Sequence, residues 1–213
     1  LGRVLAGRRG VAVLERTDQP LAEDLPLMRE VRAVIAKCLE NGREAEPLPH
    51  PGYPAWRKSA EAPRLYSGCY GLGSRDLQPA DLVGAVENML PEGAGKRFFY
   101  LSIDFAPGRA ETPAEELRRD TLAEAYPDAA ALAVHGSENP DLMPAEAISV
   151  RMHSVGGWGA MTTGKNLALT LFELLGYHIK ANPKYGSEKK GQPTTFYLAV
   201  APEPIRLNCE LQH

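Results

Sequence analysis

Short apolar runs alternate with longer segments of helical periodicity in the first half of the chain. Apolar runs at residues 11–14 and 98–103 predict buried strands, and residues 65–72, which end near Gly71 and Gly73, predict a further strand. Between them, apolar residues recur at helical spacing in residues 26–39 and in a segment that begins at Pro79. The order strand, helix, strand, helix, strand predicts an α/β fold with a Rossmann-like parallel sheet, in which the fully apolar third strand is central.

Local features refine the elements of this first segment. The pair Asn41-Gly42 is expected to end the first helix. Residues 47–63 contain five prolines and predict a loop. At the end of the first strand, Glu15 and Arg16 form either an ion pair or the edge of a site, because open α/β sheets bind ligands at strand ends. The second helix is expected to bury one apolar side, formed by Leu82, Val83, Val86, Met89 and Leu90.

A second segment begins with alternating residues at 148–155, which predict a strand. This strand runs into a glycine-rich turn and then into a helix that Gly176 is expected to end. Short strands are predicted from residue 179 and at residues 196–200. In the helix between the glycine-rich turn and Gly176, the side chains of Leu167, Leu171, Leu174 and Leu175 are expected to face the core.

The composition is that of an ordinary soluble globular protein. Of the 213 residues, 44% are hydrophobic and 24% are charged, with a formal net charge of −3. No apolar run approaches the roughly 18 residues of a membrane span, and the first residues do not resemble a signal peptide. The three cysteines form no CxxC pair, which argues against a metal site and favours the reducing cytoplasm. The first residue is Leu1 rather than Met, so we expect a fragment or a processed chain.

The charge is unevenly distributed along the sequence. Residues 1–150 hold 17 basic and 23 acidic side chains, whereas residues 151–213 hold 7 and 4. Such an asymmetry indicates a change of domain or of partner near residue 150. A linker is expected before this point, with one helix that begins at the capping box Thr112-Pro113-Ala114-Glu115.

The sharpest motif runs from Gly159 to Asn166 and has the spacing of a Walker A loop. Asn166 stands where a Ser or Thr should hold Mg²⁺, so three interpretations remain open. In the first, the loop is that of a working NTPase, and the chain as a whole would be a P-loop-like or Rossmann-like phosphate-binding protein without redox chemistry. In the second, the glycines only permit a tight turn from strand to helix. In the third, backbone N–H groups and the helix dipole hold a phosphate-bearing ligand. The candidate binding residues are Gly156, Gly157, Gly159, Thr163 and Lys165.

A lysine-rich segment at residues 184–190 is the second motif. It is either a solvated loop or an anion site, in which lysines act as point charges and hydroxyl groups add hydrogen bonds. Its candidate residues are Ser187, Lys189 and Lys190. The five histidines show no metal-ligand spacing, and no nucleophile–base arrangement is recognisable. We therefore assign no catalytic residue and no metal site.

Several blocks resemble, in order, the 2-oxoacid:ferredoxin (or flavodoxin) oxidoreductases of the pyruvate synthase type. The blocks are residues 11–16 with 25–31 (VAVLER and LPLMREV), 70–76 (YGLGSRD), 151–168 and 184–206. The resemblance implies three parts. Residues 1–105 would end a transketolase C-terminal-like domain, residues 106–147 would be the linker, and residues 148–213 would begin a gamma-type domain.

The resemblance also implies an activity for the whole enzyme. It would decarboxylate a 2-oxoacid such as pyruvate oxidatively to an acyl-CoA, with thiamine diphosphate, coenzyme A and iron–sulfur clusters. The thiamine GDG…N stretch and the CxxCxxC run are not in this sequence, so the fragment is expected to be inactive alone. Expected partners are the remaining domains or subunits, ferredoxin or flavodoxin, and a second copy of the enzyme, but neither nucleic acid nor a membrane. Coenzyme A would lie near residues 156–165 and 187–190.

Overall fold

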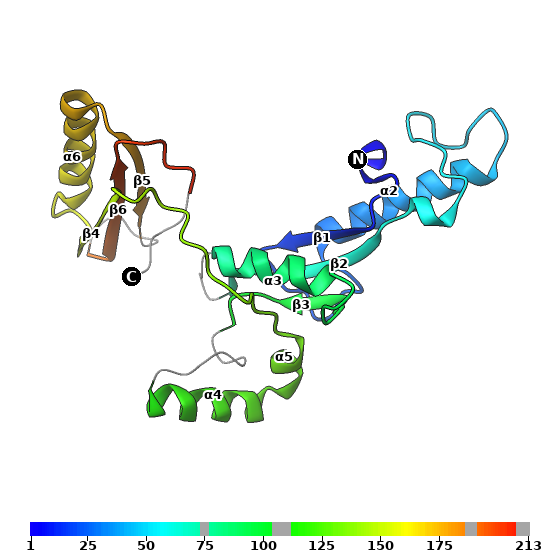
Figure 1. Cartoon of the computed structure of the whole chain (residues 1–213), viewed down its shortest axis with the longest axis horizontal. Coiled ribbons are helices and arrows are strands. Elements are labelled where there is room, and N and C mark those ends of the chain that lie inside the picture. Colours follow the sequence, from blue (N-terminus) through cyan, green and yellow to red (C-terminus); the bar gives the residue numbers. More distant parts are fainter. Residues whose placement is uncertain (73–76, 104–111, 186–190, 208–213) are drawn as a thin grey trace. The chain divides into compact units, whose positions relative to one another are not determined.

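The computed structural model describes residues 1–72, 77–103, 112–185 and 191–207. The chain divides into two compact units, Leu1–Asn139 and Pro140–His213, here called unit 1 and unit 2. Each has its own sheet (Figure 1). Each also has its own apolar clusters. The mixed arrangement of helices and two small sheets confirms the predicted α/β class.

Unit 1 is built on a parallel sheet, as its alternating strand and helix pattern predicts. The strands are β1 (Gly10–Glu15), β2 (Arg64–Cys69) and β3 (Phe98–Tyr100), paired in the order β1-β2-β3. The expectation that the third strand is central is wrong within the described part of the chain. There β2 is the central strand. On its outer side, β3 forms only an isolated bridge, between Tyr100 and Ala133.

Six helical segments accompany this sheet in the described part of unit 1. Two longer helices cross between the strands, α2 (Pro26–Arg43) and α3 (Pro79–Met89), while α1 (Gly2–Leu5) and a 3-10 turn, η1 (Ser59–Glu61), are short. The segment expected to hold one helix contains two, α4 (Pro113–Ala125) and α5 (Pro127–Leu132). The capping box at the start of α4 forms as predicted, because the Thr112 hydroxyl accepts a bond from the Glu115 N–H at 3.3 Å.

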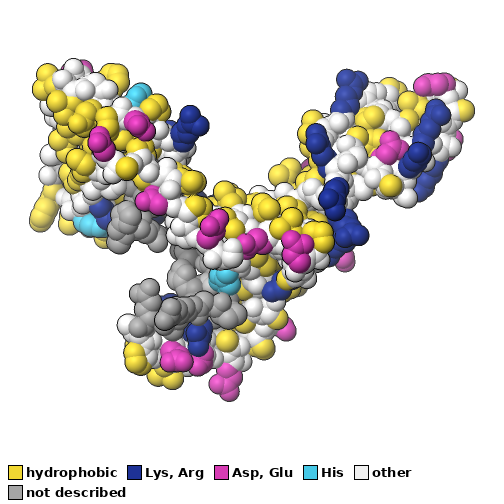
Figure 2. Space-filling model, in the orientation of Figure 1, with side chains coloured by type: hydrophobic (Ala, Val, Ile, Leu, Met, Phe, Trp, Pro, Cys, Tyr) yellow, Lys and Arg dark blue, Asp and Glu magenta, His cyan; other side chains and the backbone are white. Residues whose placement is uncertain are grey.

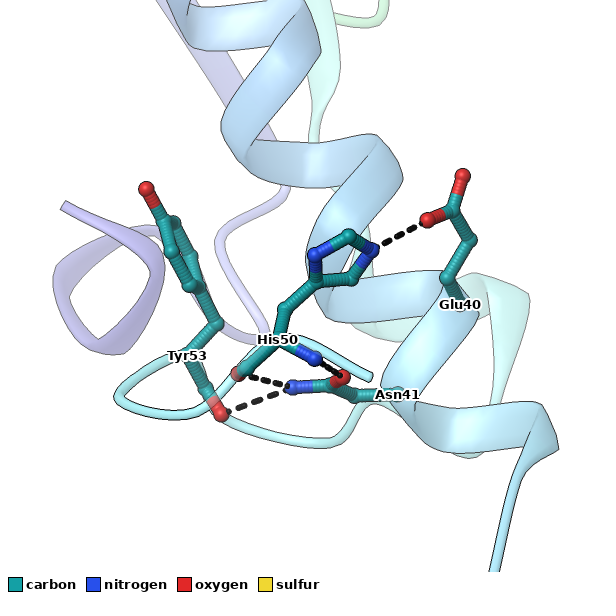
Figure 3. Close-up of polar contacts among 4 residues, drawn as sticks. All are labelled: Glu40, Asn41, His50 and Tyr53. Carbon is teal, nitrogen blue, oxygen red and sulfur yellow. Dashed lines mark hydrogen bonds and ion pairs between the residues drawn. The ribbon is translucent and has the colours of Figure 1, made fainter. Parts of the chain in front are cut away.

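The pair Asn41-Gly42 lies inside α2 and does not end it, contrary to expectation. Gly42 is required because a Cβ there would lie 1.7 Å from the carbonyl oxygen of Trp56. The Asn41 amide, which is 1% exposed, donates to the carbonyl oxygens of His50 and Tyr53 at 2.9 and 3.0 Å and accepts from the His50 N–H (Figure 3). The ring of His50, which belongs to the proline-rich loop, also contacts the Glu40 carboxylate of α2. The contacts of Glu40 and Asn41 therefore hold this loop against the helix.

The buried side of α3 is also different from the predicted one. Leu82 and Val86 are 48% and 53% exposed, whereas the buried residues are Asp81, Gly84, Ala85 and Asn88. Gly84 lies directly against the backbone of His135 and Gly136, where a Cβ would come within 2.7 Å of both. The Asp81 carboxylate accepts bonds from the backbone N–H groups of Gln78 and Ser102 at 2.8 and 3.0 Å. Close backbone approach and satisfied polar groups, rather than hydropathy, decide which side is buried.

Unit 2 contains an antiparallel sheet with one helix on it. Its strands are β4 (Ile148–Val155), β5 (His178–Lys184) and β6 (Pro193–Ala201), in the order β4-β6-β5. The expectation of a parallel sheet therefore holds for unit 1 only. The reason is the short connection between β5 and β6, because parallel neighbours need a crossover of a dozen or more residues.

Helix α6 (Ala160–Leu175) packs on one face of this sheet, and Gly176 ends it in the left-handed conformation, as predicted. Its buried residues are Gly164 and Ala168. Gly164 lets the helix approach the Phe196 ring so closely that a Cβ would lie 2.4 Å from it. Of the predicted core leucines, Leu171 packs against the cluster, whereas Leu167, Leu174 and Leu175 are 37%, 77% and 56% exposed. Figure 2 shows the resulting apolar side chains over α6.

Candidate functional site

The glycine turn between β4 and α6 presents backbone groups to solvent. Gly157 and Gly159 adopt φ values of 97° and 84°, which side chains disfavour, and neither would bring a Cβ within 4 Å of another atom. Gly159 occupies the N-cap position of α6 and has no side chain to cap the first-turn N–H groups. Trp158 between them is 79% exposed. The turn thus leads to a helix start without a side-chain cap, where the first-turn N–H groups and the helix dipole favour an anion.

Two backbone hydrogen bonds join this turn to the end of the hairpin between β5 and β6. The Gly156 N–H donates to the carbonyl oxygen of Gln192 at 2.8 Å, and the Gly191 N–H donates to the Gly156 carbonyl oxygen at 3.3 Å. Next to this bridge, Val155 is paired with Pro193 in the sheet. The structure therefore brings the glycine turn and the two residues that follow the lysine-rich segment to the same end of the sheet.

The Walker A interpretation does not fit the geometry of the motif. Residues 160–164, which would form the phosphate-binding loop, are already the first turns of α6. Thr163 and Lys165 are both exposed, but two residues on a helix are about 200° apart, so they project to nearly opposite sides. Gly164 between them is buried against Phe196. Helix α6 therefore does not place Thr163 and Lys165 where both could contact one ligand.

The candidates Ser187, Lys189 and Lys190 lie outside the described residues. Their flanks are described: Lys184 ends β5 and is exposed, and Gly191 is bonded to Gly156. Of the predicted binding residues, Gly156, Gly157 and Gly159 are therefore in one turn, with Thr163 and Lys165 on the helix that follows. Sequence analysis missed the role of Gly191 and Gln192. The glycine after the lysines was the available signal, since it takes a positive φ of 77°.

The carboxyl ends of the unit 1 strands form a second place where a ligand could be expected. Glu15 ends β1 and is 8% exposed, but its carboxylate accepts bonds from the N–H groups of Leu27 and Met28 at 2.7 and 3.0 Å. These donors belong to the first turn of α2. Glu15 therefore occupies the start of the helix as an anion would, and this helix end is not available to a ligand.

The loop after β1 covers the ends of the other two strands. The Cys69 thiol donates to the Thr17 carbonyl oxygen at 3.0 Å, and the Tyr100 hydroxyl donates to the Asp18 carboxylate at 2.9 Å. Burial raises the pKa of Cys69 from 9.0 to about 11, with the negative charges of Asp18 and Glu15 adding to the rise. Burial and the hydrogen bond to Asp18 raise the pKa of Tyr100 from 10.0 to about 12. Both groups are therefore protonated, structural donors at neutral pH.

No group of three or more His, Cys, Asp or Glu side chains in the described ranges is arranged to hold a metal ion. No helix in the same ranges is long and apolar enough to cross a membrane. The glycine turn with its adjoining hairpin is the candidate site that the geometry leaves open.

Comparison with known proteins identifies the relatives of both units. Residues 149–213 match the family model for pyruvate ferredoxin/flavodoxin oxidoreductase, which covers almost all of unit 2. The chain is 28% identical to a probable pyruvate-flavodoxin oxidoreductase of Escherichia coli over 200 residues. This alignment covers 93% of this chain and 14% of that protein. The chain is 25% identical over 198 residues to a pyruvate-flavodoxin oxidoreductase of Nostoc, again with 93% and 14% covered.

A third relative matches a shorter part of the chain. The common gamma subunit of the pyruvate/ketoisovalerate oxidoreductases of Pyrococcus furiosus is 38% identical over 64 residues, which is 30% of this chain and 34% of that subunit. The chain thus spans about a seventh of the E. coli and Nostoc relatives and about a third of the gamma subunit. Together, the family-model match and these alignments show that residues 149–213 are similar to the pyruvate ferredoxin/flavodoxin oxidoreductases, and that most of the chain is similar to a segment of such enzymes.

Proposed function

We propose that this chain is part of an enzyme that decarboxylates a 2-oxoacid such as pyruvate oxidatively, forms an acyl-CoA and passes the electrons to ferredoxin or flavodoxin. The names of the relatives support the pyruvate and flavodoxin parts of this proposal. The chain aligns with only 14% of those relatives, so the complete reaction belongs to the whole enzyme. The competing P-loop-like function finds no support in the relatives or in the helical geometry of residues 160–164.

Thiamine diphosphate and the iron–sulfur clusters are assigned to other parts of that enzyme. The sequence contains neither a GDG…N stretch nor a CxxCxxC run to hold them. The proposed partners are the remaining domains or subunits and a second copy of the whole enzyme. A cytoplasmic location is part of the proposal, and the buried free thiols Cys38 and Cys69 are compatible with a reducing compartment.

Within the enzyme, we assign unit 2 a role in binding the phosphate groups of coenzyme A. The observation that carries this role is the pair of backbone bonds between Gly156 and residues 191–192, which joins the glycine turn to the end of the lysine-rich segment. The turn supplies exposed N–H groups and the positive end of α6, and the lysines supply charge. Residues 151–213 carry more basic than acidic side chains, 7 against 4, which suits a ligand with several negative charges.

The test uses the intact enzyme with Lys189 and Lys190 both changed to Ala. Losing two phosphate contacts of about 0.5–1 kcal/mol each should raise KM for coenzyme A by about 5- to 30-fold. Because the lysines contact a part of the ligand that does not react, kcat should stay nearly constant. The matched control is Lys58→Ala, which removes an exposed lysine from unit 1. An unchanged KM for coenzyme A in the double variant would refute the assigned role.

A further inference from the structure

Helix α6 carries more large apolar side chains than the unit 2 sheet covers (Figure 2). Gly164 and Ala168 are buried against the sheet, and Leu171 packs on the same cluster. Five other large apolar residues of the helix are exposed: Leu167, Leu169, Phe172, Leu174 and, at the last position, Leu175. Apolar patches of this kind on a folded protein mark surfaces that another element or molecule covers.

Four of these exposed residues lie on the two sides of the helix rather than on its outermost stripe. Gly164 marks the direction of the sheet, because it is buried there. At 3.6 residues per turn, Phe172 and Leu169 lie about 80° and 140° around the helix from Gly164. In the opposite direction, Leu167 and Leu174 lie about 60° and 80° from it. We call these two pairs of residues the flanks of α6.

The outermost stripe of α6 is polar instead. It lies about 160–240° from Gly164 and consists of the exposed residues Thr162, Asn166, Thr170 and Glu173. A helix with this pattern is typical of the middle of a helix layer, where neighbouring helices cover both flanks and water meets the outer stripe. In the described part of unit 2, α6 is the only helix. The pattern therefore predicts neighbours that unit 2 does not itself supply there.

The sheet beneath α6 has an edge at which it can be extended. Among the described strands of unit 2, β4 and β5 are the edges, because β6 lies between them. The edge strand β5 contains Pro183, which cannot donate a backbone hydrogen bond. The eight-residue β4 contains no proline, and its Ile148 is 58% exposed although it is in register with Val200 of the cluster beneath α6. Nothing in the sequence of β4 thus prevents a further strand from pairing with it.

We propose that further helices of the same enzyme, from chain outside these 213 residues, pack on both flanks of α6. This inference rests on the proposed function only in so far as the chain is part of a larger enzyme. The alignment with the E. coli relative covers 93% of this chain but 14% of that protein, so most of such an enzyme lies outside the aligned segment. There is therefore enough further chain to supply the neighbours.

A second copy of this chain is the competing occupant. When two identical surfaces meet about a twofold axis, the same patch of both copies forms the contact. One flank of α6 would then be covered in each copy, and the other flank would stay exposed. The presence of apolar residues on both flanks therefore favours neighbours from the rest of the enzyme.

The experiment compares how fast a maleimide labels a cysteine on α6 in the full chain and in the intact enzyme. Phe172→Cys and Leu174→Cys report on the two flanks, and Thr170→Cys is the matched control on the polar stripe. In the full chain all three should react rapidly, because the positions are exposed. In the intact enzyme, the two flank variants should react at least about tenfold more slowly, since a covered thiol is reached only after local opening. The control should react at an unchanged rate.

Mass spectrometry of the α6 peptide separates these cysteines from all other thiols of the enzyme. If a variant does not fold in the intact enzyme, oxidation of the unchanged Phe172 by hydroxyl radicals gives a readout without substitution. This oxidation should be weaker in the intact enzyme than in the full chain. Equal oxidation in both would contradict the proposal in the same way as equal labelling.

Three labelling results would overturn the proposal. The first is an equal rate at the flanks in the full chain and in the intact enzyme. The second is equal slowing at all three positions, which would indicate a partner on top of the helix. The third is slow labelling of one flank in the full chain that depends on its concentration, which would assign that flank to a second copy.

Turnover of a 2-oxoacid by the unchanged intact enzyme is measured separately. An active enzyme with rapidly labelled flanks would refute this inference and leave the proposed function standing. An inactive enzyme with covered flanks would support this inference and refute the proposed function.

Discussion

Unit 1 and unit 2 treat the ends of their strands in opposite ways. In unit 1, Glu15 occupies the start of α2, and the loop after β1 is bonded to Cys69 and Tyr100. In unit 2, the strand β4 ends in a turn whose first-turn donors have no side-chain cap. In unit 1, the polar groups at the strand ends are therefore hydrogen-bonded within the chain. In unit 2, the first-turn N–H groups of α6 are left for another molecule.

This difference shows why a fold class alone does not locate a site. Open parallel sheets bind ligands at the carboxyl ends of their strands, which would direct attention to unit 1. There, a carboxylate of the chain already takes the place of an anion at the helix start. A site is better sought where polar groups are not already bonded within the chain, and for this reason we propose the glycine turn of unit 2.

The largest expected effect tests whether the two units keep separate cores. Phe196 is 1% exposed and fills the space between the unit 2 sheet and Gly164. Phe196→Ala should reduce the free energy of unfolding of unit 2 by about 3–5 kcal/mol. Hydrogen exchange should accelerate in β4, β5 and β6 but not in β1 and β2. Leu174→Ala, at a 77% exposed position on α6, is the control. Equal acceleration in both units would show that the two cores unfold together.

A smaller effect is expected at the closed strand ends of unit 1. Glu15→Ala removes the acceptor of two N–H groups at the start of α2 and should cost about 1–2 kcal/mol of stability. Glu15→Gln keeps an acceptor oxygen and should cost less. Urea denaturation measures both changes. A Glu15→Ala chain as stable as the original would mean that this carboxylate does not hold the helix, and the contrast with unit 2 would lose its main support.

The smallest effect is a pH dependence that belongs to unit 1. The pKa of Cys69 is raised from 9.0 to about 11 in the folded chain, so the unfolded state loses this proton first as the pH rises. Stability from this group is complete below about pH 9 and is lost as the pH rises toward about 11. Cys69→Ser should make the urea midpoint fall less over this interval. The same fall in both proteins would assign the alkaline loss to other groups, of which Tyr100 is the first candidate.

The sequence predicts most elements of this fold but not the sides that they bury. Strand β4 and the stop of α6 at Gly176 are predicted correctly, because alternation and a C-terminal glycine are local signals. The buried sides of α3 and α6 are predicted only in part, because Met89 and Leu171 pack on the cores but other predicted residues are exposed. In both helices a glycine, Gly84 or Gly164, permits an approach so close that larger apolar residues are displaced to the exposed side. Such an approach depends on residues far away in the sequence.

The candidate site is predicted in part for a related reason. The glycine turn follows from Gly156, Gly157 and Gly159, which are visible as a motif. Its pairing with Gly191 and Gln192 depends on an antiparallel register that no local pattern specifies. Local sequence therefore identifies the turn, and the sheet register identifies what lies beside it.

The bridge between Gly156 and residues 191–192 uses main-chain atoms only. Its strength therefore does not depend on which side chains occupy the hairpin between β5 and β6. Over evolution, the charge and the hydroxyl content of residues 186–190 can change without the loss of the anchor beside them. Substitutions there would alter how strongly this part of the chain attracts an anion, while the bonds between Gly156 and residues 191–192 would remain.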